Sequence, residues 1–319
     1  IRDSRSLAQT NATVQATAAT PSQCMPGTYY TTTWDGRVYK GNYSLSTAAA
    51  PVPAFNFARR GFNGYSGDQV NALGISANGN LTFALDRDDD TNVVDILRYD
   101  ATSRANSAVK RIQLADIRQS GFRTSGVVGG AVQGSGEESD YYFGGFTTGE
   151  VKTRYWVDPV YDWRSVWDPY YGQYVWKYVE VQPGYWASVS QYTVRFNLWR
   201  YDYATNTVAY VGYTTVQQSN NRIPPGNGDF AFDAQGNLFV IYSTTQSTKI
   251  IPINVNALNS AESRLTVGVD DQRTNEYYEI ETDDSRTLPG SSSVYYGGTF
   301  NSDGTMLTQL DNSNGYPYF

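Results

Sequence analysis

The sequence has no histidine and a single cysteine, Cys24, among its 319 residues. Without histidine, this chain cannot build a Ser-His-Asp triad, a Cys-His pair or a histidine-ligated metal centre. With one cysteine it forms no internal disulfide, so its stability must come from sheet packing in a sizeable core. Glycine loops that bind phosphates or dinucleotides are also missing. These absences remove most common classes of enzyme.

Charged residues are scarce too, at 17% of the chain, and the net charge is -7. A nucleic-acid partner would require clustered Lys and Arg, so none is expected. No stretch approaches the roughly 18 apolar residues of a membrane span. Most of the polarity comes from uncharged side chains, as in exported β proteins, and the sequence opens without Met or a signal peptide. We therefore expect a processed chain that is secreted or displayed at the cell surface.

A hairpin pattern occurs twice, at residues 71–86 and 229–242. In each copy an apolar alternation meets a polar-Gly pair, Asn78-Gly79 or Gln235-Gly236, and then a second apolar run. This predicts two strands joined by a two-residue turn. Weaker copies stand at Asp35-Gly36 and Asp303-Gly304. The apolar side chains of the two main copies are expected to face the core between sheets: Leu73, Ile75, Leu81, Phe83, Phe230, Phe232, Leu238 and Val240.

Third strands are predicted at residues 95–102 and 197–205, which share the phrase Arg-Tyr-Asp followed by Ala-Thr. Each unit then becomes a four-stranded antiparallel meander, the form of one propeller blade. These repeated phrases resemble those of non-enzymatic β-propellers of secreted and cell-surface bacterial proteins, such as adhesin heads. Adjacent glycines, as at Gly129 and Gly130, are typical of the crowded inner strands of a propeller. Residues 107–116 fit either an outer strand or a short helix.

The fold class is therefore all-β: a propeller of four-stranded antiparallel blades over residues 28–319, with six blades as the preferred number within a range of five to seven. Residues 1–27 are rich in Ala, Thr, Gln and Ser without periodicity. They are expected to form a flexible segment or to lie across the domain. No convincing amphipathic helix longer than about ten residues is present.

An insertion at residues 155–186 contains five of the seven tryptophans. Its two Asp-Pro pairs and a Tyr-rich bend predict a long hairpin, with Tyr174, Trp176 and Tyr178 on one face. Its rings either fold back onto the propeller or form an exposed binding surface, since Tyr and Trp are enriched at binding hot spots and stack on sugars. The exposed alternative predicts a ligand-binding set of Trp163, Trp167, Tyr170, Tyr171, Tyr174 and Trp176, with Asp162, Arg164 and Asp168 as polar groups at the rim.

The acidic segment at residues 86–92 concentrates carboxylates as a calcium loop does, although it lacks the glycine and the final glutamate of an EF-hand. It is either a solvated acidic loop or an irregular Ca²⁺ site, for which Asp86, Asp88 and Asp90 are the predicted ligands. The same residue types serve glycosidases, which need only two carboxylates. The candidates for that role are Asp35, Asp86, Asp140, Asp229 and Asp233.

Two functions follow from these patterns. The preferred one is a non-catalytic extracellular adhesion domain that recognises a glycan or a protein on a host or neighbouring cell. The alternative is a carboxylate-dependent propeller glycoside hydrolase.

Overall fold

The computed structural model describes residues 28–42, 51–59, 69–88, 93–113, 123–219, 227–243, 248–263, 279–280, 282, 286–287, 295–300 and 306–310. Almost all of these residues lie in antiparallel strands, and the helix α1 (Val255–Glu262) is short. No described helix has the length and apolar character needed to cross a bilayer. The predicted flexible segment at residues 1–27, including Cys24, and the turn at Gly304 lie outside the described residues.

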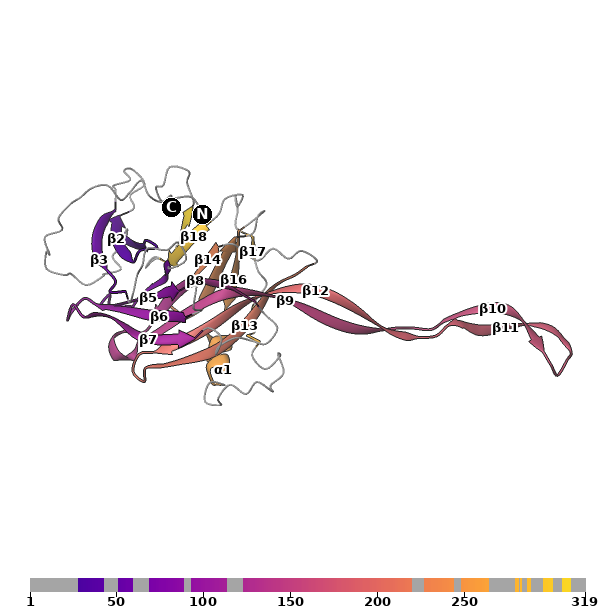
Figure 1. The fold of residues 1–319 in the computed structure, drawn as a ribbon. Helices are drawn as coiled ribbons and strands as arrows, with labels where there is room; N and C mark the ends of the chain where they lie inside the picture. Colours follow the sequence, from indigo (N-terminus) through magenta and orange to yellow (C-terminus); the bar gives the residue numbers. More distant parts are fainter. Residues whose placement is uncertain are drawn as a thin grey trace.

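Successive antiparallel sheets account for the body of the molecule (Figure 1). The first contains β1 (Thr28–Thr32), β2 (Arg37–Asn42) and β3 (Val52–Asn56). The second contains β4 (Gln69–Ile75), β5 (Leu81–Asp88), β6 (Val93–Asp100) and β7 (Asn106–Gln113), paired in that order. Of the two alternatives for residues 107–116, the outer strand is the one observed, as β7.

The third sheet is interrupted by the insertion and pairs in the order β8, β9, β12, β13. Its strands are β8 (Arg123–Gln133), β9 (Asp140–Val157), β12 (Tyr185–Asp202) and β13 (Thr207–Ser219), with a short 3-10 turn, η3 (Gly136–Glu138), between the first two. The insertion therefore joins the second strand of this sheet to the third, and it carries β10 (Val160–Asp168) and β11 (Gln173–Gln182).

The fourth sheet repeats the meander, and two further strands follow it. The fourth sheet contains β14 (Asn227–Phe232), β15 (Leu238–Ser243), β16 (Thr248–Ile253) and β17 (Arg286–Thr287). The last pair is β18 (Tyr295–Phe300) with β19 (Met306–Leu310). The repeat at residues 71–86 and 229–242 is confirmed, because both copies form the first two strands of their sheets.

Consecutive sheets pack face to face, with β4, β8, β14 and β18 side by side as the first strand of each. Three buried clusters fill the spaces between consecutive sheets, each joining side chains of two neighbours. Meanders stacked in this way are propeller blades. Apart from the β10–β11 ribbon, the described strands make five such sheets, so the number six stays a prediction.

The glycine pair of β8 is crowded, as expected for inner strands. A Cβ at Gly130 would stand 2.4 Å from the carbonyl oxygen of Ala72 on β4, and one at Gly129 would stand 2.8 Å from the Cα of Asp229 on β14. Only glycine allows three neighbouring backbones to approach this closely. The pair therefore sets the distance between consecutive blades.

The length of the turn was predicted wrongly in both hairpins. Residues 76–80 and 233–237 separate the paired strands, so the turns are longer than two residues. The Asp233 carboxylate explains the second of these, because its Oδ1 accepts hydrogen bonds from the backbone N–H of Gln235 and Asn237, each at 2.9 Å. The glycine of each pair does take a positive φ, 73° at Gly79 and 84° at Gly236.

The predicted core residues are mostly correct. Five of them are fully buried: Leu81, Phe83, Phe230, Leu238 and Val240. Leu73 and Phe232 are partly buried against the clusters, whereas Ile75 is half-buried outside them. A β-bulge between Asn71 and Gly74 explains the difference, because it shifts the alternation and turns Ala72 inward.

Candidate functional site

The insertion forms a ribbon that extends far from the body of the molecule (Figure 1). Its base is the outer half of β9 and β12, which pair without interruption from Asp140–Asp202 in the body of the molecule to Val157–Tyr185. Proline then interrupts both strands, at Pro159 and Pro183, since it cannot donate a backbone hydrogen bond. Beyond this break β10 and β11 pair to the tip. Turns were expected at both Asp-Pro pairs. The first, Asp158-Pro159, lies at the break between β9 and β10, and the second, Asp168-Pro169, lies at the turn at the tip.

The described side chains from residue 152 to residue 190 are exposed or half-buried, and none is buried. Of the two alternatives for the aromatic insertion, the one in which the rings fold back onto the propeller is wrong. The predicted projecting hairpin is confirmed.

The tip is a tight turn held by Asp168. Its backbone carbonyl accepts from the N–H of Gly172 at 2.9 Å, and its Oδ1 accepts from the N–H of Tyr170 at 3.0 Å. Gly172 takes a φ of 64°, in the left-handed region that favours glycine. Tyr170 is 86% exposed and contacts Tyr171 edge to face, with ring centroids 5.0 Å apart. The turn therefore presents two tyrosines at the far end of the ribbon.

One face of the β10–β11 ribbon is aromatic. Cross-strand partners share a face, and the register pairs Trp163 with Tyr178, Ser165 with Trp176 and Trp167 with Tyr174. All the rings of this face are between 44% and 70% exposed. We call it the aromatic face; its rings belong to Tyr161, Trp163, Trp167, Tyr174, Trp176 and Tyr178.

Neighbouring rings of the aromatic face support one another. The centroids of Trp163 and Tyr178 lie 5.5 Å apart and those of Trp167 and Tyr174 5.3 Å apart, in tilted and edge-to-face arrangements. Tyr161 stacks on the other side of Tyr178 at 5.6 Å. Such contacts restrict the rotamers of these side chains before a ligand arrives. Binding then costs less side-chain conformational entropy.

The opposite side, the polar face, carries the charged residues of β10 and β11 other than Glu180. Arg164 and Lys177 are cross-strand partners, and their like charges are compensated by acids on the same face. Asp162 is 3.2 Å from the Arg164 Nε, and Asp168 Oδ2 accepts from the Lys177 Nζ at 2.9 Å. The Lys177 ammonium thereby lowers the pKa of the Asp168 carboxyl.

The predicted rim of Asp162, Arg164 and Asp168 is therefore wrong in position. These side chains alternate with the rings along β10, and a one-residue step in a strand reverses the face. Sequence reasoning also left Tyr161 and Tyr178 out of the ligand-binding set. The alternation of residues along β10 and along β11 indicated which side chains of each strand share a face. It did not indicate how the two strands align, which depends on the cross-strand register.

A second aromatic pair stands at the base of the ribbon. Trp156 and Trp186 are cross-strand partners with ring centroids 5.6 Å apart, and both are exposed. The Trp156 ring packs over Gly184, where a Cβ would approach it to 2.2 Å. These two tryptophans were also absent from the predicted set.

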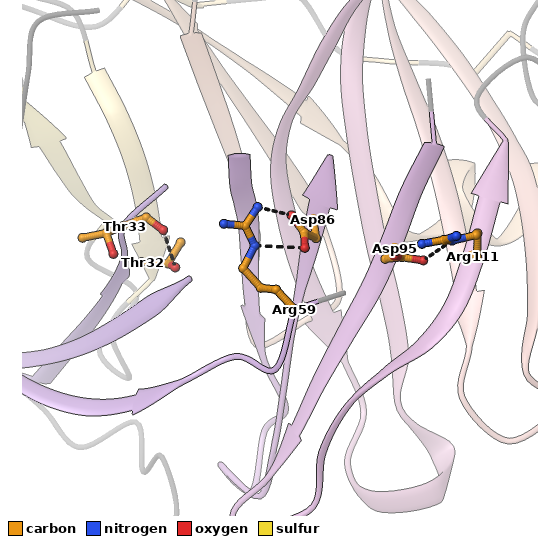
Figure 2. A network of polar contacts seen from close by, with 6 residues as sticks. All are labelled: Thr32, Thr33, Arg59, Asp86, Asp95 and Arg111. Atoms are coloured by element: carbon orange, nitrogen blue, oxygen red, sulfur yellow. Dashed lines mark hydrogen bonds and ion pairs between the residues drawn. The ribbon is translucent and has the colours of Figure 1, made fainter. Parts of the chain in front are cut away.

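Two of the three predicted calcium ligands lie on the second sheet. Asp86 and Asp88 belong to β5, and Asp90 lies outside the described residues. Asp86 forms a bidentate ion pair with Arg59, at 2.6 Å and 3.0 Å (Figure 2). In the described residues no three acidic or cysteine side chains gather as a metal site. The Ca²⁺ site remains a prediction, and Asp86 would have to leave Arg59 to join it.

The candidate catalytic carboxylates are dispersed. Asp35 and Asp233 serve turns, and Asp229 accepts from the backbone N–H of Phe230. Asp140 differs, because both it and Glu262 lie 3.7 Å from the Arg200 Nη1. Burial raises the pKa of Asp140 to about 6, Arg200 opposes that rise, and nearby Asp202 and Glu262 add to it.

Tyr142 completes the cluster at Asp140 by donating a hydrogen bond to Glu262. Burial, together with this glutamate, raises the pKa of the Tyr142 hydroxyl well above its usual value. Asp140 and Arg200 come from the third sheet, whereas Glu262 ends α1 beside the fourth. The cluster therefore ties two consecutive blades together.

No protein-family model and no curated protein matches this sequence. Its fold is similar to solved β-propeller domains. With the Nup133 propeller of Vanderwaltozyma polyspora it shares 9% identity at a TM-score of 0.39, covering 90% of this chain and 67% of that one. With the Cps50 (Swd1) propeller of Myceliophteria thermophila it shares 9% identity at a TM-score of 0.34, covering 95% of this chain and 96% of that one. With the propeller of the Trilobed protease from Pyrococcus furiosus it shares 7% identity at a TM-score of 0.27, covering 88% of this chain and 82% of that one. TM-scores below 0.5 carry no argument about function.

Proposed function

We propose that this protein is a non-catalytic extracellular binding domain, in which a propeller body holds the aromatic ribbon out toward a glycan or a protein on another cell surface. The observation that carries the proposal is the exposed aromatic face. The largest contiguous apolar patch on a soluble monomer, typically about 300–600 Å², is often a binding site. Tyr and Trp are also the residue types that dominate binding energy at interfaces.

The shape of the ribbon supports the same function. Its paired strands leave the body as continuations of β9 and β12, whose inner halves are anchored by buried residues such as Phe143, Phe146, Phe196 and Leu198. A binding site built on strands that continue from a packed sheet is positioned more precisely than one built on a loop. The low charge and the abundance of uncharged polar residues support an extracellular location.

Deletion of the ribbon tests the proposal. Replacing residues 155–186 by a short Gly-Ser turn removes no buried side chain. The free energy of unfolding should therefore change by no more than about 0.5 kcal/mol and the melting temperature by no more than about 1 °C. Binding to a panel of bacterial and eukaryotic cells should be lost. Undiminished cell binding by the folded variant would refute the proposal.

The hydrolase alternative is favoured by one observation, the raised pKa of Asp140 beside Glu262. A carboxyl group whose pKa is raised toward neutral pH is suited to general acid catalysis. Turnover measured on a panel of glycosides distinguishes the two functions. Hydrolysis that disappears in Asp140→Asn but persists in the ribbon deletion would put the hydrolase first.

A further inference from the structure

We infer that the aromatic face binds a neutral glycan, laid along the ribbon across Trp163, Trp176 and Trp167. This inference rests on the proposed binding function and specifies its ligand. The alternatives are a folded protein, a second copy of this chain and a membrane surface. Chemistry, charge and size of the face each bear on that choice.

The chemistry of the face is amphipathic throughout. Its six rings are all Tyr or Trp, and it carries no Phe, Leu or Ile. Each ring combines a flat apolar surface with a hydrogen-bonding N–H or O–H at its edge. A pyranose has the complementary form, since C–H groups make its faces apolar and hydroxyl groups surround it. A purely apolar partner would displace water from the ring N–H and O–H groups and offer them no hydrogen bond in return.

The arrangement of the rings suits an extended chain. Trp163, Trp176 and Trp167 occupy consecutive rungs of the ribbon, which lie about 6.8 Å apart because same-face residues repeat every two positions. Ser165 is the partner of Trp176, so no ring stands across from that indole, which is 70% exposed. The Ser165 hydroxyl adds a hydrogen-bonding group beside the central ring. The three indoles therefore form a stepped platform with one polar group in the middle.

Charge favours a neutral ligand. Glu180 is the acid on the aromatic face, and its carboxylate already accepts a hydrogen bond from the Tyr161 hydroxyl at 3.2 Å. Arg164 and Lys177 lie on the polar face, where Asp162 and Asp168 pair with them. The aromatic face therefore offers no cation to an acidic glycan or to an anionic lipid headgroup. The net charge of -7 also disfavours approach to anionic membranes.

Size disfavours a protein partner. Nine residues of strand span about 30 Å, and two strands make the ribbon about 10 Å wide, so the aromatic face covers about 300 Å². A stable protein interface buries about 800 Å² on each side. A second copy or a folded protein would need more surface than this face provides. A linear oligosaccharide uses a narrow strip of this kind in full.

Intrinsic fluorescence makes a direct assay possible, because five of the seven tryptophans lie in the ribbon region. The full chain is first applied to a printed array of neutral and acidic oligosaccharides. The strongest neutral glycan is then titrated against the wild type, Trp176→Ala and the neighbouring polar-face variant Lys177→Gln. We expect Trp176→Ala to lower affinity at least tenfold, with Lys177→Gln within twofold of the wild type.

Each contrary result has a separate meaning. If no neutral glycan binds, while ribbon-dependent cell binding persists after enzymatic deglycosylation, the glycan inference fails and the binding function stands. If phosphatidylcholine vesicles, and no glycan, shift the tryptophan emission of the wild type but not of the ribbon deletion, the ribbon is a membrane anchor and the inference fails. Equal affinities of Trp176→Ala and the wild type also overturn it. If the ribbon deletion still binds cells, both proposals fail.

Discussion

The buried ion pair between Arg59 and Asp86 gives the sharpest test of the packing of the second blade. The side chains are 6% and 9% exposed, and the pair is bidentate. On the neighbouring strand β6, Asp95 is the cross-strand partner of Asp86 and pairs with Arg111, whose side chain is 53% exposed (Figure 2). The two carboxylates thus lie side by side on neighbouring strands, and each is paired with its own arginine.

Replacing Arg59 with methionine keeps the apolar bulk of the side chain but leaves the Asp86 carboxylate buried beside Asp95. Loss of one partner of a buried pair costs about 3–5 kcal/mol. Repulsion between two carboxylates about 5 Å apart has the same order, about 3 kcal/mol at an effective dielectric constant of 20. The melting temperature should therefore fall by about 6–10 °C.

Urea denaturation measures the effect, with Arg111→Met as the matched control. Asp95 is itself buried but Arg111 is 53% exposed, so loss of Arg111 should cost less than loss of Arg59, about 1–3 kcal/mol. The double variant Arg59→Met/Asp86→Leu should regain most of the lost stability, since neither charge then remains buried. If Arg59→Met proves no more destabilising than Arg111→Met, the pair is not a buried one and this reasoning is wrong.

Three further outcomes are expected. Gly130→Ala should lower the free energy of unfolding by about 1–3 kcal/mol, measured by urea denaturation, because its Cβ would meet the carbonyl of Ala72 at 2.4 Å. The raised pKa of Asp140, about 6, means that the folded state holds this proton more tightly than the unfolded state. The stability from this group is present below about pH 4 and lost as the pH rises through 6. The urea midpoint of the wild type should accordingly fall relative to Asp140→Asn across that window, and parallel profiles would contradict the shift. Calcium at about 100 times its Kd should stabilise the fold by about 2.7 kcal/mol if the predicted site of Asp86, Asp88 and Asp90 binds it, and a melting temperature unaffected by calcium and by chelator would exclude the site.

The local elements of this chain could be predicted from its sequence. Turn glycines such as Gly79 and Gly236 mark positions with positive φ, and apolar alternation around them predicts the strands. The adjacent glycines of β8 predict close contact between inner strands, which Gly130 makes with Ala72. These features depend on the conformational range of single residues and on the two-residue period of a strand. Both act within a few positions of the chain.

Cross-strand and long-range relations were decided only by the tertiary structure. Register brought the rings of two strands onto one face, because it pairs Trp163 with Tyr178 and Trp167 with Tyr174, and one residue of displacement would separate them. Arg59 lies far along the chain from Asp86, and nothing in the acidic pattern around Asp86 indicates that an arginine from another segment satisfies it. The alternation along each strand states which residues share a side. Which strands meet, and in which alignment, depends on the free energy of the whole packed sheet.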